Sequence, residues 1–163
     1  MGEGIDPQES VRRARAAAVS VRLDQVTEEA LKADRFMPEL FSQTKPVMIG
    51  DIDAFISHSW RDDAGAKFEA LRRWSDAFYA QNRRWPMLWI DKFCIDQKDI
   101  DANLMCLPVF LSGCKTILLM VGTTYLSRLW CILEIFVFFE MGADVDRVEL
   151  KLISEKSGAL VTV

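Results

Sequence analysis

Residues Thr116–Val121 (TILLMV) indicate the fold class, because almost all of their side chains are apolar. A strand that is apolar on both faces must be covered on both faces, which is typical of a parallel sheet. Three further segments predict strands: residues 52–57 (IDAFIS) and 87–91 (MLWID) are largely apolar, and residues 148–153 alternate apolar with charged side chains. That alternation predicts an edge position for the last strand.

Helical patterns separate these strands. The first helix follows the candidate N-caps Asp62 and Asp63 and has an apolar face with spacings of three and four. The others span residues 103–112, where Pro108 should bend or shorten the helix, and residues 129–141. Alternating strands and helices predict an α/β domain whose parallel sheet carries helices on both faces.

The first fifty residues have a different pattern. Residues 11–33 are rich in good helix formers, and apolar side chains recur there at steps of three and four from Val19 to Ala33. We therefore expect residues 1–50 to form a helical extension and linker, which either covers an edge of the sheet or serves self-association. Residues 51–163 form the expected α/β domain.

Composition excludes several classes of function. The chain has 163 residues and a net charge of −4, so it is a poor candidate for general nucleic-acid binding. No apolar run reaches the roughly 18 residues of a membrane span. The polar, acidic start lacks the features of a secretory signal, which favours a cytoplasmic location.

The four cysteines stand in apolar surroundings, and no two have C-x-x-C spacing. A free thiol in such a context behaves as a small hydrophobic group. With only one histidine in the chain, the usual zinc ligands are lacking, so we predict reduced thiols and no metal site. These cysteines are Cys94, Cys106, Cys114 and Cys131.

In parallel α/β sheets, ligands bind beyond the carboxyl ends of the strands. The candidate site segments are therefore residues 57–63, 91–100 and 122–130. None of them contains a glycine-rich phosphate cradle of the common types, so a nucleotide would have to be held in another way.

Glu134 is the only ionisable residue between Arg128 and Glu140. It belongs to a helix that is apolar on nearly all sides and should be largely buried. A buried carboxyl group must be paired, protonated or turned toward a cavity. Pairing with Arg128 is one reading, and a catalytic role is another. Trp130 lies one turn earlier, where it could stack on a flat ligand ring or belong to the core.

The polar loop after the first strand supplies two more candidates. His58 could hold the loop in place or act as a general base, although no nucleophile motif accompanies it. Arg61 could bind a phosphate group or pair with Asp62 or Asp63.

Three motifs resemble known families. Residues 52–58 (IDAFISH) resemble the opening motif of Toll/interleukin-1 receptor (TIR) domains, and residues 127–134 (SRLWCILE) resemble their Trp-Cys-x-x-Glu helix motif. Residues 89–97 (WIDKFCIDQ) resemble a signature of fungal heterokaryon-incompatibility domains. The resemblance covers roughly residues 51–153, and the motifs occur in the family's order.

The resemblance implies a flavodoxin-like parallel sheet with the strand order 2-1-3-4, in which residues 161–163 could begin a fifth strand. It also implies cleavage of NAD⁺ between nicotinamide and ribose, by hydrolysis or cyclisation, in defence or cell-death signalling. Glu134 maps onto the catalytic glutamate of enzymatic members.

For substrate binding we single out the polar and aromatic residues at the strand ends, with NAD⁺ as substrate and no further cofactor: Ser57, His58, Arg61, Asp91, Asp96 and Trp130. Homo-oligomers through TIR–TIR contacts are expected. The alternative is a non-enzymatic signalling scaffold that acts by self-association.

Overall fold

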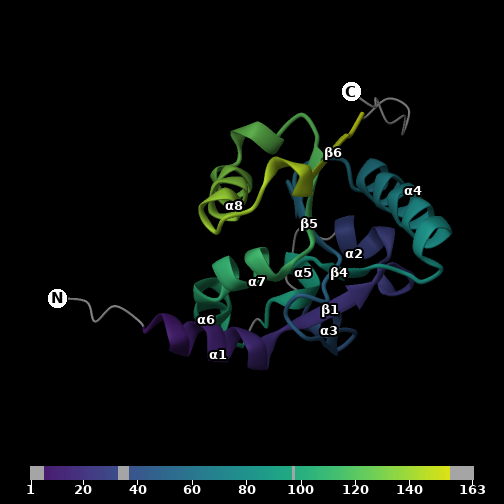
Figure 1. Ribbon diagram of the computed structural model, residues 1–163. Coiled ribbons are helices and arrows are strands. Elements are labelled where there is room, and N and C mark those ends of the chain that lie inside the picture. The colour runs from purple at the N-terminus through teal and green to yellow at the C-terminus, as the bar shows by residue number, and fades with distance from the viewer. Residues whose placement is uncertain (1–5, 33–36, 97, 155–163) are drawn as a thin grey trace.

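The computed structural model describes residues 6–32, 37–96 and 98–154 (Figure 1). The α-helices are α1 (Pro7–Ala17), α2 (Glu28–Lys32), α3 (Pro38–Phe41), α4 (Ala64–Asn82), α5 (Asp91–Cys94), α6 (Ile100–Met105), α7 (Leu107–Gly113) and α8 (Leu129–Glu140). The strands are β1 (Val19–Arg22), β2 (Lys45–Pro46), β3 (Ala54–His58), β4 (Met87–Trp89), β5 (Thr116–Val121) and β6 (Val148–Leu152). Short 3-10 turns are η1 (Leu23–Gln25), η2 (Tyr125–Ser127) and η3 (Val145–Arg147).

The strands form one mixed six-stranded sheet in the order β2-β1-β4-β3-β5-β6. The predicted α/β class is confirmed, but the wholly parallel, flavodoxin-like 2-1-3-4 sheet is not the sheet observed. The strands near residues 52–57, 87–91, 116–121 and 148–153 are parallel neighbours in the succession β4-β3-β5-β6. Beyond β4 the sheet continues with β1 and β2, which pair antiparallel. The possible fifth strand at 161–163 lies outside the described residues.

The helical prediction for residues 11–33 is therefore wrong in its middle. The helix α1 ends at Ala17, and β1 follows, with Val21 fully buried beside Leu88 of β4. The apolar pattern of this segment fits a period of two as well as a period near four, so sequence periodicity could not separate strand from helix. The unpaired edge of β4 favours a strand over a helix in this segment, because β1 satisfies backbone groups of β4 that would otherwise be unpaired. Ala33 lies outside the described residues.

Helices cover both faces of the sheet, as Figure 1 shows. On one side α4 packs against α2, and Trp74 of α4 donates a 2.7 Å hydrogen bond to Glu149 of β6. On the other side α8 contacts β3, and α7 packs against α8 and α1. The core between them contains a stack of Phe55 on Trp89, with ring centroids 4.6 Å apart. No helix in the described ranges is long and apolar enough to cross a membrane.

Two local expectations are confirmed. Asp63 caps α4, since its side chain accepts a 2.7 Å hydrogen bond from the backbone N–H of Ala66. Pro108 divides the helix expected over residues 103–112 into α6 and α7. The proline stands in the first turn of α7, where its missing N–H costs nothing.

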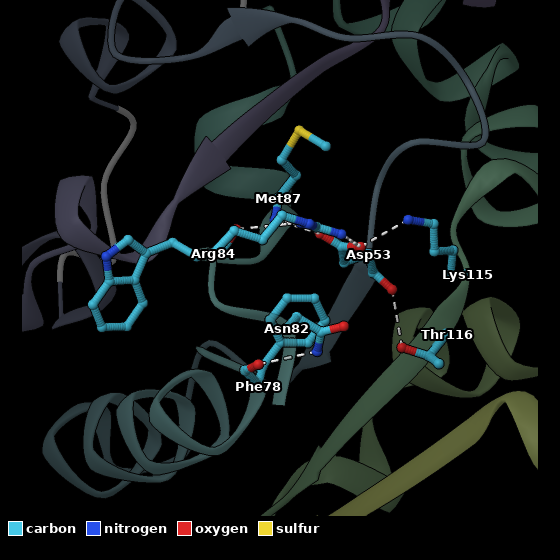
Figure 2. Close-up of polar contacts among 8 residues, drawn as sticks. Asp53, Phe78, Asn82, Arg84, Met87, Lys115 and Thr116 are labelled. Atoms are coloured by element: carbon cyan, nitrogen blue, oxygen red, sulfur yellow. Dashed lines mark hydrogen bonds and ion pairs between the residues drawn. The ribbon is translucent and has the colours of Figure 1, made fainter. Parts of the chain in front are cut away.

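The amino end of β3 is fixed by a buried carboxylate. Asp53 accepts hydrogen bonds from both terminal nitrogens of Arg84, at 2.6 and 2.8 Å, and forms a 2.9 Å ion pair with Lys115 (Figure 2). The backbone N–H of Met87 donates a fourth bond to this carboxylate. Burial opposes ionisation, but these partners outweigh it and lower the pKa of Asp53. The cluster joins β3 to its two neighbours, β4 and β5.

Candidate active site

Two of the predicted site residues, Ser57 and Glu134, meet near the carboxyl end of β3. Ser57, which is fully buried, donates a 2.5 Å hydrogen bond to Oε2 of Glu134 on α8. The hydroxyl of Tyr125, in η2, lies 2.6 Å from the same Ser57 Oγ. Because Ser57 gives its proton to Glu134, Tyr125 is the donor in this second bond. Three polar side chains thus form one chain of hydrogen bonds in an otherwise apolar core.

Glu134 is buried, with 3% of its surface exposed, and forms no ion pair among the described residues. Pairing with Arg128 is therefore not observed. Burial raises the pKa of Glu134 to about 8, and the negative charge of Asp91 adds to the rise. Hydrogen bonds from Ser57 and Trp130 act in the opposite direction, because they stabilise the ionised carboxylate. The group is consequently poised to change its protonation state near neutral pH.

A cavity of about 320 Å³ lies next to this carboxyl group. Its walls include Trp130 and Cys131 from α8, together with Arg128 at the N-cap of that helix. Glu134 itself is not part of the wall. Trp130 lines the cavity and lies one helical turn before Glu134, so the wall that it forms is the part of the cavity nearest to Glu134 along α8. The remaining wall residues are His58, Ser59, Trp60, Asp91, Ile95, Ile100 and Leu104.

His58 and Asp91 form the polar side of the cavity. Nε2 of His58 lies 3.3 Å from Oδ1 of Asp91, at an orientation that does not make a hydrogen bond. The other oxygen of Asp91 accepts a 2.7 Å bond from the indole N–H of Trp60. Burial opposes ionisation of Asp91, but His58, Trp60 and the N–H of Lys92 lower its pKa. Asp91 is therefore a fixed anion, and the described residues supply no hydrogen-bond partner for Nδ1 of His58. An unpartnered buried nitrogen in a cavity wall is a natural contact for a ligand.

Two buried lysines contact the loop that follows β3. Nζ of Lys67 donates a 2.7 Å bond to the carbonyl oxygen of Ser59, and Nζ of Lys92 lies 4.4 Å above the ring of Trp60. Burial, together with the positive charge of Lys92, lowers the pKa of Lys67 to about 8. Both amino groups are too buried to touch a ligand, so their role is to hold the loop and its charge in place.

The structure brings together most of the residues predicted for the site, but not all of them. Ser57 and Glu134 are bonded, and His58, Asp91 and Trp130 line the adjacent cavity. Arg61 is exposed, pairs with neither Asp62 nor Asp63, and does not reach the cavity wall. Asp96 lines a different and larger cavity of about 490 Å³ beside α1 and α6.

Sequence reasoning missed three members of the site. Arg128 lines the cavity in place of Arg61, and it stands at the start of a motif that the sequence did single out. Trp60 belongs to the polar loop after β3 and orients Asp91. Tyr125 had no signal in the sequence, because its bond to Ser57 joins residues 68 positions apart.

The cysteines are free and buried in the structure. Burial raises the pKa of Cys94 and of Cys131 to about 12, so both are unreactive thiols rather than nucleophiles. Within residues 6–32, 37–96 and 98–154, no three potential metal ligands come together.

Comparison of the chain with protein-family models, with curated proteins and with solved structures found no match.

Proposed function

We propose that the chain cleaves NAD⁺ between nicotinamide and ribose, as a TIR-like glycohydrolase or cyclase with Glu134 as the catalytic residue. One observation carries the proposal: a buried carboxyl group with a pKa raised to about 8 accepts a 2.5 Å hydrogen bond from Ser57 and lies one helical turn from Trp130, which lines the cavity. The two motifs that resemble TIR domains supply Ser57 and Glu134, and the 2.5 Å bond between these residues joins the motifs in space.

The reaction requires little from the protein beyond one negative charge. The bond from ribose C1′ to the pyridinium nitrogen breaks, and its electron pair leaves with nicotinamide, which departs neutral. No acid is needed for this step, and the sugar becomes oxocarbenium-like. A carboxylate stabilises that positive charge. Water then adds to C1′ and loses a proton, which gives ADP-ribose, whereas attack by a nitrogen of the adenine ring gives a cyclic product.

The raised pKa fits a cationic substrate. In the free protein at neutral pH, burial keeps a large share of Glu134 protonated. A bound pyridinium cation would favour the ionised form, because opposite charges stabilise one another in a buried site. Trp130 would have to yield its position so that Glu134 reaches the ribose. Arg128 would take the diphosphate of the substrate.

The decisive experiment follows nicotinamide release from NAD⁺ by the wild type and by Glu134→Gln. Glu39→Gln is the matched control, because it makes the same substitution at an exposed side chain outside the site. We expect release by the wild type and the control, with a loss of about 10²–10³ in rate for Glu134→Gln. Absence of nicotinamide release by the wild type over a wide range of protein concentration would refute the proposal.

A scaffold without catalytic activity is the second candidate. It is favoured by the apolar outward side of α8, where Leu129 is 82% and Phe136 is 59% exposed. In that case Glu134 would serve only the hydrogen bond with Ser57. A defence or cell-death role by self-association fits either candidate.

A further inference from the structure

The outward side of α8 carries four apolar side chains, which we call the outer stripe: Leu129, Ile132, Leu133 and Phe136. Their exposed fractions are 82%, 40%, 39% and 59%. The spacings of three, one and three residues place them on one face of the helix. The opposite face holds Glu134 and is buried. Figure 1 shows α8 on the outside of the molecule, away from the helix α4.

The exposed apolar area of the outer stripe and its neighbours is large for a surface that contacts only solvent. Leu126, 71% exposed, precedes it, and Phe139, 42% exposed, lies at its margin. Together these six side chains expose on the order of 600 Å², which is as large as the biggest apolar patches of monomeric proteins. It is also most of the roughly 800 Å² that each partner contributes to a stable interface.

Charges at the two ends of α8 specify what would cover the stripe. Glu140, at the C-terminal end, is exposed and has no ion pair in the described part of the chain. At the N-terminal end, Arg128 likewise has no ion pair there, and no side chain caps the helix. The first turn therefore offers a positive charge and free backbone N–H groups, which attract a carboxylate.

We infer that the outer stripe binds the outer stripe of a second copy of this chain, with the two α8 helices antiparallel about a twofold axis. The stripe has no charged member, so it is complementary to itself, as a twofold interface requires. Antiparallel packing places Glu140 of the partner subunit beside Arg128 and the uncapped start of α8. A lipid surface is a poorer occupant, since membrane-bound amphipathic helices are rich in basic residues, whereas this stripe has one basic residue, Arg128, at one end and the acidic Glu140 at the other.

The interface lies on the helix that also holds Glu134, but its existence does not rest on the proposed catalytic activity. Because Glu134 projects from the opposite side of α8, contact between two α8 helices would restrict the motion of the helix that positions the carboxyl group. The mass of the complex tests the interface, and NAD⁺ cleavage is measured separately, so the two proposals can fail independently.

The test is the molar mass of the full chain, measured by sedimentation equilibrium over roughly 1–100 µM, where an interface of this modest size should dissociate. We expect a transition from the 18.6 kDa chain to twice that mass. Phe136→Asp should weaken the dimer at least tenfold, because it places a charge in the centre of the apolar contact. Met48→Asp is the matched control, since Met48 is 75% exposed but lies outside α8. Circular dichroism checks that each variant is folded.

A charge reversal tests the orientation. Glu140→Arg should weaken the dimer, and the double variant Arg128→Glu/Glu140→Arg should restore it by exchanging the two partners. The inference is overturned by a wild type that stays monomeric at the highest concentration, or by a dimer that survives Phe136→Asp. It is also overturned by a monomer that binds phosphatidylcholine vesicles through α8, because lipid would then be the occupant.

Discussion

The hydroxyl of Ser57 and the carboxyl group of Glu134 are joined by a 2.5 Å hydrogen bond, although the residues are 77 positions apart. Ser57 is a buried residue near the end of β3, and Glu134 comes from the buried face of α8, so the bond ties the sheet to the helix that covers it. Because Ser57 donates its proton to Glu134, its oxygen is left to accept from the hydroxyl of Tyr125, 2.6 Å away. The bond partly compensates for the burial of Glu134 but does not remove its cost, since the pKa of the carboxyl group remains raised to about 8.

Glu134→Gln should therefore stabilise the protein in a pH-dependent way. The folded-state pKa is about 8, above the ordinary value of 4.5, so wild-type stability falls as pH rises from about 4.5 to about 8. Glutamine does not titrate, and the advantage of the variant should grow to the order of a few kcal/mol across that range. Urea unfolding at the two ends of the range measures this. If the variant is less stable at both ends, Glu134 has a purely structural pairing role.

The rate of NAD⁺ cleavage should increase with pH. The active form of Glu134 is the ionised one, so kcat/KM should rise as pH rises through about 8 and level off above it. If a bound cation favours ionisation, the rise in kcat should come at lower pH than the rise in kcat/KM. Steady-state measurements of nicotinamide release give both profiles. Rates that do not change across this window would contradict a titrating Glu134.

Ser57→Ala should shift the pH profile of kcat/KM to higher pH. The substitution removes the hydrogen bond that lowers the pKa of Glu134, so the rise in kcat/KM should shift to higher pH. It also leaves the hydroxyl of Tyr125 without its acceptor, at a cost of about 1–3 kcal/mol in unfolding free energy. Tyr125→Phe is the control, because it keeps the bond from Ser57 to Glu134. We expect that variant to shift the profile less.

Asp53→Asn should reduce stability without reducing the activity per folded molecule, because Asp53 lies at the opposite end of β3 from the cavity. The partners Arg84 and Lys115 are about half exposed and can return to water, so the loss should be on the order of 1–3 kcal/mol. The folded-state pKa of Asp53 lies below 3.8, so its contribution is present above that pH and disappears as pH falls below it. Urea unfolding of both proteins at neutral and at acid pH checks this.

The thiols should be reduced and slow to react. All four cysteines are buried and free in the structure, and burial raises the pKa values of all four. A colorimetric thiol reagent should react with them slowly in the native protein and with all four in denaturant. An intact mass two daltons below that of the reduced chain would indicate a disulfide instead.

Local sequence patterns were sufficient to predict the α/β class and the strands that lie at the centre of the sheet. Thr116–Val121 is apolar throughout, and a strand of that kind is stable only between two layers. The same reasoning located Glu134 in a buried position, because every neighbour within four residues of it along α8 is apolar or aromatic. The burial of a side chain in a helix depends on how apolar its neighbours are, and these neighbours can be read from the sequence.

The edges of the sheet and the residues of the site depend on long-range packing, which local patterns do not predict. Residues 19–22 fit a helix and a strand equally well, and the open edge of β4 selected the strand. Arg61 lies three residues after the end of β3 but is exposed, whereas Arg128, 67 positions later, lines the cavity. Tyr125 reaches Ser57 because η2 follows β5, which is the parallel neighbour of β3 in the sheet. Such contacts depend on how distant segments pack. A local sequence pattern does not identify the distant residue that a side chain will contact.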